Sequence, residues 1–214
     1  MSQLNYPLVT HLSSTEYLNY ETPKFSKSQG IGVFGNQVIT ISKTLGIDED
    51  YWRDYLLKIR PETSDSSFNL TEFVSVIKSD LAQKLGSFIH RCVVLVDQYY
   101  GHQCFIQYNI SNIQEKASLL SIINNYRNNI LNFHYREAIK NINELTHLGN
   151  SYLNVHSIWK LCQDDPIKHE LIMGNCLFII YCLAELLDPI IPRKANTIKS
   201  YITVQSDTTI LTVY

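Results

Sequence analysis

The sequence predicts a mainly α-helical fold in which about four long helices form a bundle. Apolar residues recur every three or four positions between Asn69 and Tyr99, which is the period of a helix that buries one face. Long segments of the same kind follow at about 111–131 and 135–153, and Pro166 stands where a further helix can begin. Short links join these segments, and no repeats or low-complexity tracts interrupt them, so an α-bundle is expected.

The composition limits the possible functions. The chain has 214 residues, of which 45% are hydrophobic and 18% are charged, as is ordinary for a globular protein. A formal net charge of −2 provides no global basic field, so any contact with RNA must rest on a local patch. Five cysteines without a Cys-x-x-Cys pair argue against zinc knuckles and a disulfide framework, and they predict reduced thiols in the cytosol.

Two further patterns concern membranes. The longest apolar run, from Cys176 to Ala184, is too short to cross a bilayer. Met1 to Glu16 contains no charged segment followed by an apolar one, so no secretory signal is visible. We therefore expect a cytoplasmic protein without a membrane partner.

The first part of the chain is predicted to contain a short strand and two helices. The strand is expected within residues 1–19, where nothing supplies a partner strand for its edge. Asn36 can cap a first helix that stops at Gly46. Asp48 can cap a second helix, which Pro61 ends.

The polar stretch 64–68 is the expected domain boundary. Residues 1–66 would then form one domain and residues 67–201 the helical bundle, whose final helix covers about 191–200. Residues 202–214 are rich in Thr and Val and are predicted to be strand-like, as a divergent tail.

The segment from Lys24 to Gly35 contains the candidate phosphate-binding residues. Lys24 and Lys27 place two ammonium groups three residues apart, and Ser26 and Ser28 add hydroxyls. The glycines that follow, beginning with Gly30, allow positive φ and close approach of the backbone to a ligand. Flexible ammonium groups suit the stabilisation of moving polyphosphate charge. The residue types alone thus indicate a phosphate-handling loop, with an ordinary solvated loop as the alternative.

The order of these residues resembles the Lys-Met-Ser-Lys-Ser loop of class I aminoacyl-tRNA synthetases. The longer run from Glu16 through Gly35 is similar to cytosolic-type methionyl-tRNA synthetase. Three later pieces follow in that family's order and spacing: Trp52-Arg53-Asp54-Tyr55-Leu56-Leu57, Ile59-Arg60-Pro61-Glu62 and Gly149-Asn150-Ser151-Tyr152. The resemblance covers residues 6–201. It implies that residues 1–66 end a Rossmann-type catalytic domain and that residues 67–201 form an anticodon-binding domain.

The resemblance also implies roles in the activation of methionine by ATP. Lys27 would stabilise the charge that develops on the phosphates, with Lys24 as the second candidate. Ser26, Ser28 and Gly30 would shape the loop. ATP with Mg²⁺ is the implied co-substrate, and no metal site is expected within this chain.

For the anticodon of tRNA(Met), the resemblance implies three positions. Arg91 matches the family's anticodon arginine and Trp159 its stacking tryptophan, whereas Ser87 stands where the family has an asparagine. Ser87 and Arg91 are spaced i, i+4 and so share one face of the long helix. Ile158 replaces the proline that often precedes the tryptophan. The alternatives are a surface ion pair for Arg91 and a core position for Trp159.

One tetrapeptide is expected to be a coincidental match. His147-Leu148-Gly149-Asn150 reads like the family's nucleotide-binding histidine motif, but it follows the lysine loop and lies within a helical run. The chain thus lacks that motif, the first Rossmann strands and the methionine pocket. We expect a C-terminal part of a methionine–tRNA ligase that is inactive alone, with methionine and ATP bound through the missing half. A non-catalytic tRNA-binding or scaffold protein derived from a synthetase is the alternative, and a multi-synthetase complex is a possible assembly.

Overall fold

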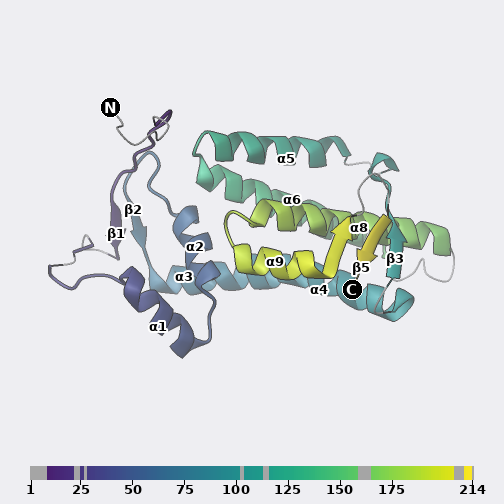
Figure 1. Cartoon of the computed structure of the whole chain (residues 1–214), viewed down its shortest axis with the longest axis horizontal. Helices are drawn as coiled ribbons and strands as arrows, with labels where there is room; N and C mark the ends of the chain where they lie inside the picture. The colour runs from purple at the N-terminus through teal and green to yellow at the C-terminus, as the bar shows by residue number, and fades with distance from the viewer. Residues whose placement is uncertain are drawn as a thin grey trace, which may run out of the picture.

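The computed structural model describes residues 9–21, 25–26, 28–101, 104–112, 116–158, 165–204 and 210–213. The first part of the molecule is a small unit around two strands, and the rest is an elongated bundle whose helices run lengthwise (Figure 1). The mainly α-helical fold that the sequence predicts is confirmed.

The first unit has the order β1, α1, α2, β2, α3. Its elements are β1 (Leu18–Tyr20), α1 (Gly35–Leu45), α2 (Glu49–Lys58), β2 (Ser66–Phe68) and α3 (Leu70–Val76). The two strands are parallel, with Leu18 opposite Ser66 and Tyr20 opposite Phe68. The expectation of an unpartnered strand was therefore wrong, because the stretch predicted to be a polar boundary forms the partner strand.

Four buried aromatic residues form the core of this unit: Trp52, Tyr55, Phe68 and Phe73. The rings of Trp52 and Phe73 stack with centroids 4.5 Å apart, and the ring of Tyr55 meets that of Phe68 edge-on. Offset and edge-to-face pairs of this kind add to the stabilisation that burial provides. The core joins α2 to β2 and α3, and so lies on both sides of the expected boundary near residue 66.

Helix starts are confirmed where a side chain caps the backbone. Asp48 accepts a hydrogen bond from the Asp50 amide at 3.1 Å, and α2 begins there as predicted. The predicted cap at Asn36 was wrong, because α1 already begins at Gly35. The Gln37 side chain accepts a hydrogen bond from the Phe34 amide at 3.0 Å and so satisfies the start of the helix.

The long helix predicted over residues 69–99 is continuous but not α-helical throughout. Between α3 and α4 (Ser87–Tyr100), the ten residues of η1 (Ile77–Gly86) are π-helical. Asn150 from α6 donates its side-chain amide to the Lys84 carbonyl, at 3.3 Å, within this segment. The apolar spacing of this helix did not identify its buried face correctly at the start: Val74 of α3 has that spacing but is 58% exposed, whereas its neighbour Phe73 is buried.

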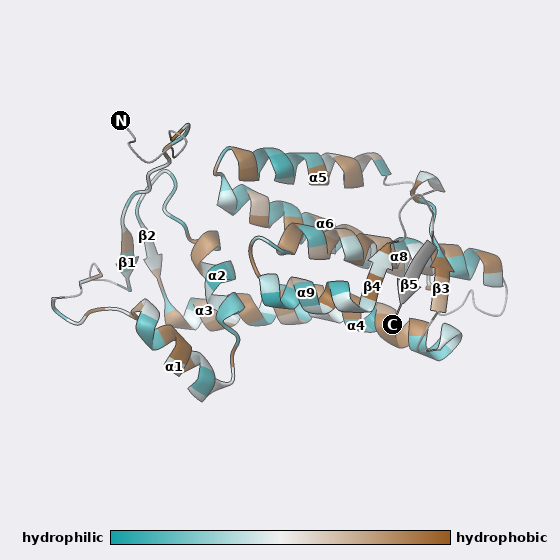
Figure 2. Ribbon diagram, in the orientation of Figure 1, coloured by the Kyte–Doolittle hydropathy of each residue, from teal (hydrophilic) through white to brown (hydrophobic). Residues whose placement is uncertain are grey.

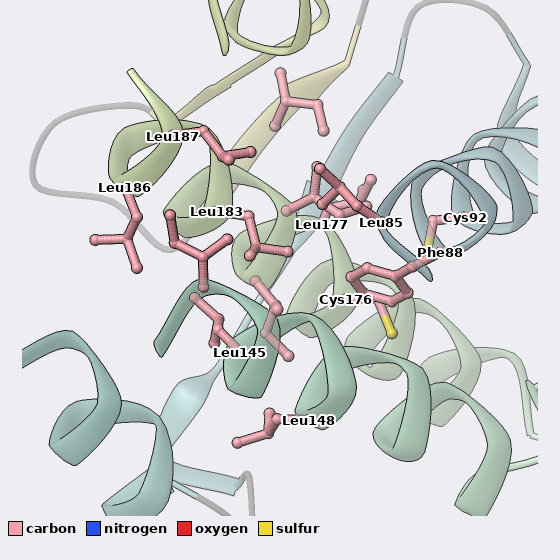
Figure 3. Close-up of a cluster of buried hydrophobic side chains, with 14 of the residues drawn as sticks. Leu85, Phe88, Cys92, Leu145, Leu148, Cys176, Leu177, Leu183, Leu186 and Leu187 are labelled. Atoms are coloured by element: carbon pink, nitrogen blue, oxygen red, sulfur yellow. The ribbon is translucent and has the colours of Figure 1, made fainter. Parts of the chain in front are cut away.

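The bundle packs around its most apolar helix. It consists of α4, α5 (Lys116–Leu131), α6 (Tyr135–Val155), α8 (Pro166–Leu187) and α9 (Pro192–Tyr201). Figure 3 shows Cys176, Leu177 and Leu183 of α8 packed between residues of α4 and α6. Among the described residues, α8 alone is long and apolar enough to cross a membrane, but 67% of its apolar window is buried inside the fold. It therefore serves as the central helix of the bundle, and polar residues alternate with apolar ones along its neighbours (Figure 2).

A three-stranded antiparallel sheet closes one end of the bundle. It consists of β3 (Cys104–Gln107), β5 (Ile210–Val213) and β4 (Ile202–Val204), in the order β3-β5-β4. The strand-like character predicted for the C-terminal residues is confirmed for β4 and β5. Strand β3 was not predicted from the sequence. It crosses α8 at Gly174, where any side chain would collide with the Gln107 carbonyl.

Candidate nucleotide loop and nucleic-acid interface

The loop between β1 and α1 is closed by two backbone hydrogen bonds. The Ser26 amide donates to the Ile31 carbonyl at 3.0 Å, and the Ile31 amide donates to the Ser26 carbonyl at 2.9 Å. Within this closure the hydroxyls of Ser26 and Ser28 lie 3.3 Å apart. Gly30 has a φ of 68°, a conformation that a glycine adopts without strain. Ser26, Ser28 and Gly30 thus lie in one closed turn.

Phe25 fixes the base of this loop. Its ring contacts Tyr20 edge-on with centroids 5.3 Å apart, and it meets Phe34 at 6.5 Å. Gly32 has a φ of 119° and makes room for the ring, because a Cβ there would collide with Phe25. The aromatic side chain between the two lysines therefore anchors the loop to the core of the first unit.

The two lysines themselves, Lys24 and Lys27, lie outside the described residues. Their roles remain predictions that rest on the resemblance. The structure describes the rest of the loop, which is a closed turn with two hydroxyls that is anchored at Phe25 and followed by α1.

Helix α2 connects the first unit, which carries the serine–glycine loop, to the bundle. The sequence alone did not predict this connection. Trp52 donates from its indole Nε1 to the Ser42 hydroxyl of α1, at 2.9 Å in a buried position. The next residue, Arg53, donates from Nε to the Ile190 carbonyl at 2.9 Å and from Nη2 to the Pro189 carbonyl at 3.1 Å. The adjacent residues Trp52 and Arg53 thus bind α1 on one side of α2 and the turn between α8 and α9 on the other.

Charged pairs reinforce this connection at the N-terminal end of α2. Asp48 lies 3.1 Å from the Lys194 ammonium of α9. Burial acts to raise the pKa of Asp48, but the Asp50 amide and Lys194 outweigh it and hold that pKa below its usual value. The hydrogen bond to Asp48 in turn raises the pKa of Lys194.

A second charged cluster joins the C-terminal end of α2 to the π-helical segment. The Lys58 ammonium lies 2.8 Å from Asp54 and 3.1 Å from Asp80, and Asp80 also pairs with Lys84 at 2.8 Å. Burial raises the pKa of Asp54 despite its pairing with Lys58. Burial also acts to raise the pKa of Asp80, but hydrogen bonds from Lys84 and Lys58 bring it below its usual value.

The predicted anticodon positions lie on α4, beside α6. Arg91 is half-buried and donates from Nη2 to the Asn154 side-chain oxygen at 2.7 Å. Ser87, one turn earlier on α4, is exposed. The partner of Arg91 in this contact is a neutral amide, whereas the ion-pair alternative expected a charged partner. Asn154 was missed, although it follows closely on Gly149-Asn150-Ser151-Tyr152.

Trp159, the predicted stacking residue, lies outside the described residues. The chain enters that segment from Ile158, which is 0% exposed, and Ser157 has a φ of 42°. The isoleucine that replaces the family's proline is thus a core residue.

The tetrapeptide His147-Leu148-Gly149-Asn150 lies inside α6, as expected. Gly149 packs against the Phe88 ring of α4, and a Cβ there would lie 2.5 Å from the ring carbon Cζ. His147 is exposed, and Asn150 binds helix carbonyls. Packing between two helices accounts for the glycine without a nucleotide.

Across the described part of the chain, no group of three or more His, Cys, Asp or Glu residues could hold a metal ion. The described cysteines, Cys92, Cys104, Cys176 and Cys182, are free. Burial raises the pKa of the Cys182 thiol to about 12, which keeps it protonated.

In comparisons with known proteins, two family models match successive parts of the chain, and both describe the same kind of enzyme. The family model described as "tRNA synthetases class I (M)" matches residues 1–93. The family model described as "Anticodon binding domain of methionyl tRNA ligase" matches residues 109–211.

Curated relatives agree with both models. A methionine–tRNA ligase of Acanthamoeba polyphaga mimivirus is 41% identical over 194 residues, which are 91% of this chain and 34% of that protein. The cytoplasmic methionine–tRNA ligase of Mus musculus is 34% identical over 92% of this chain and 22% of its own length. The chain thus spans about a third or less of these relatives.

Solved structures show the same fold. Methionyl-tRNA synthetase from Mycobacterium tuberculosis, in complex with methionyl-adenylate, superposes with a TM-score of 0.69 at 22% identity. The match covers 86% of this chain and 36% of that one.

Proposed function

Because the chain belongs to the methionyl-tRNA synthetase family, we propose that it works as part of a protein that activates methionine with ATP and transfers it to tRNA(Met). The observation that carries this proposal is that one chain holds a closed serine–glycine loop and, on α4, the Arg91–Asn154 contact. A protein that only bound tRNA would have no use for a phosphate loop.

In this proposal the loop supplies positive charge to ATP. Lys27 stabilises the negative charge that moves onto the leaving pyrophosphate as the methionine carboxylate attacks the α-phosphorus. Lys24 adds a second ammonium, while Ser26, Ser28 and Gly30 hold the turn in shape. Mg²⁺ arrives with ATP as part of the substrate.

The bundle reads the anticodon. Trp159 offers a stacking surface, and Arg91 and Ser87 offer hydrogen bonds to the edges of unstacked bases, as is usual for sequence-specific recognition of RNA loops. The Asn154 oxygen holds the Arg91 guanidinium in place before RNA binds. Arg91 is half-buried, so its orientation is set by the protein and little conformational freedom is lost on binding.

We propose that residues 1–66 end the catalytic domain, that residues 67–201 form the anticodon-binding domain and that residues 202–214 form a divergent tail. The aromatic core that joins Trp52 to Phe73 fastens the two domains together. Relatives named cytoplasmic support a cytoplasmic location. Membership of a multi-synthetase complex remains a prediction.

The test is the binding of anticodon stem–loop RNA to this chain. We expect an RNA with the CAU triplet to bind at least about tenfold more tightly than one with a scrambled triplet, because each wrong base loses a contact. Arg91→Ala should remove most of that preference, and Arg127→Ala, at an exposed position of α5, should keep it. Equal binding of both RNAs would contradict the proposal.

The alternative, a non-catalytic tRNA-binding or scaffold protein, is favoured by the departures from the family pattern at Ser87 and Ile158 and by the net charge of −2. Methionylation assays on the protein purified from its natural source separate the two. Charging of tRNA(Met) that copurifies with this chain supports the ligase. A purified chain that selects CAU without any charging activity supports the scaffold.

A further inference from the structure

A cavity of about 230 Å³ lies between the C-terminal end of α4 and the first turn of α8. Its walls are Tyr99, Tyr100, Pro166, Ile167, His169 and Glu170. It is found at the end of the bundle that carries β3 (Figure 1). The volume is smaller than that of pockets for drug-sized ligands, and it suits a group as small as one nucleobase.

The centre of this wall is an aromatic group around His169. The His169 ring is 2% exposed, meets the Tyr99 ring edge-on at 4.8 Å and lies over the Tyr100 ring at 5.7 Å. Its Nδ1 is 2.7 Å from the Tyr100 hydroxyl. Burial lowers the pKa of His169, so the ring is neutral near pH 7. A neutral aromatic surface favours a flat aromatic ligand.

One polar atom of this group is left without a partner. The Nε2 atom of His169 is buried and has no hydrogen-bond partner among the described residues. A buried polar atom of this kind costs about as much as a lost hydrogen bond, and functional sites are one of the places where such atoms occur.

Glu170 gives the cavity an acidic side, which favours some aromatic ligands over others. Within the part of the chain that the structure describes, Glu170 accepts one long hydrogen bond, at 3.3 Å from the Gln107 amide, so its carboxylate retains acceptor capacity. A carboxylate repels phosphate and accepts hydrogen bonds from the amino groups of cytosine and adenine. Beside it, Ile167 is 82% exposed and offers an apolar rim.

The position of the cavity points to the RNA that the chain is proposed to bind. Tyr99 follows Arg91 by eight residues of α4, a distance of about 12 Å along the helix. We propose that this cavity binds one unpaired base of the anticodon loop, next to the triplet and bearing an amino group. The base stacks on Tyr99 and its amino group donates to Glu170. This inference rests on the proposed function, since it takes the same RNA as ligand.

The experiment measures the binding of CAU stem–loop RNA to the chain by fluorescence anisotropy. Tyr99→Ala should raise the Kd about 5- to 160-fold, the usual loss when an aromatic partner of a base is removed. Tyr99→Phe keeps the ring and should bind within about twofold of the wild-type chain. Leu131→Ala, at an exposed apolar position where α5 ends, should leave the Kd unchanged.

Two further RNAs, each with an abasic site on one side of the triplet, identify the base. One of these two RNAs lacks the base that stacks on Tyr99. For that RNA, the Kd of Tyr99→Ala should equal the Kd of the wild-type chain. The proposal is overturned if Tyr99→Ala binds the intact RNA normally, or if it loses the same factor on all three RNAs. Failure of the proposed function is a different result, in which even the wild-type chain does not prefer CAU.

Discussion

Arg53 of α2 and Ile190, in the turn between α8 and α9, are joined by a hydrogen bond of 2.9 Å from guanidinium Nε to carbonyl oxygen. Because the adjacent Trp52 binds Ser42 of α1, α2 links α1, the helix that follows the serine–glycine loop, to the bundle. The relationship spans 137 positions in sequence.

Replacement of Arg53 by Met should lower the free energy of unfolding by about 1.5–3 kcal/mol, because two carbonyls lose a charged donor. Urea denaturation of the chain measures this loss. Arg127→Met, at an exposed position of α5, should change stability by less than about 0.5 kcal/mol. Equal effects of the two variants would show that Arg53 contributes only as a surface cation.

Gly149→Ala should destabilise the chain by about 1–3 kcal/mol, because the new methyl group would overpack against Phe88. Alanine is otherwise the better helix former, so a stabilised variant would mean that α4 and α6 can separate at no cost. Gly35→Ala is the matched control, since nothing lies within 4 Å of a Cβ at that position. Thermal unfolding of both variants decides the question.

Lowering the pH from about 7 should reduce stability through His169. Burial lowers its pKa in the folded chain, so the unfolded chain takes up a proton first, below about pH 6.5. The stability that the neutral ring provides is present above that pH and decreases as the pH falls toward the folded-state pKa, by at most about 1.4 kcal/mol per pH unit. His169→Gln should flatten this slope in urea titrations. His147→Gln, at an exposed position, should retain it.

Lys27→Ala in the full-length enzyme should slow methionyl-adenylate formation by about a hundredfold or more, because charge develops on the phosphates only in the transition state. ATP binding should change far less. Pre-steady-state kinetics of methionyl-adenylate formation measures the rate, and a separate titration measures the affinity for ATP. Equal losses in rate and affinity would remove the transition-state role.

Trp159→Ala in the full-length enzyme should weaken the use of tRNA by about 1–3 kcal/mol, the usual value of one base stacked on an aromatic ring. ATP–methionine exchange should be unaffected, because the ring is proposed to contact only the anticodon. Charging kinetics at varied tRNA concentration measure the first quantity. An unchanged charging rate would assign Trp159 to the core.

Features set by local chemistry were predictable from the sequence. Asp48 and Pro166 mark helix starts through their own side chains, and both predictions are confirmed. Contacts between distant segments were not predictable. Ser66–Phe68 is polar enough to be read as a linker, and it becomes a strand only because β1 lies beside it. The neutral partner of Arg91 likewise depends on how α6 packs against α4.

The π-helical segment has a consequence for how the gene can vary. Phe73 packs in the aromatic core of the first unit, and Leu85 packs in the core of the bundle. The π-helical segment Ile77–Gly86 lies between them, so its length sets how far one core is rotated relative to the other about the helix axis. One inserted or deleted residue in this segment would turn Ser87 and Arg91 by about 100° relative to the loop-bearing unit. We therefore expect homologous genes to tolerate changes of sequence here but not changes of length, whereas loops at the ends of the bundle can lengthen freely.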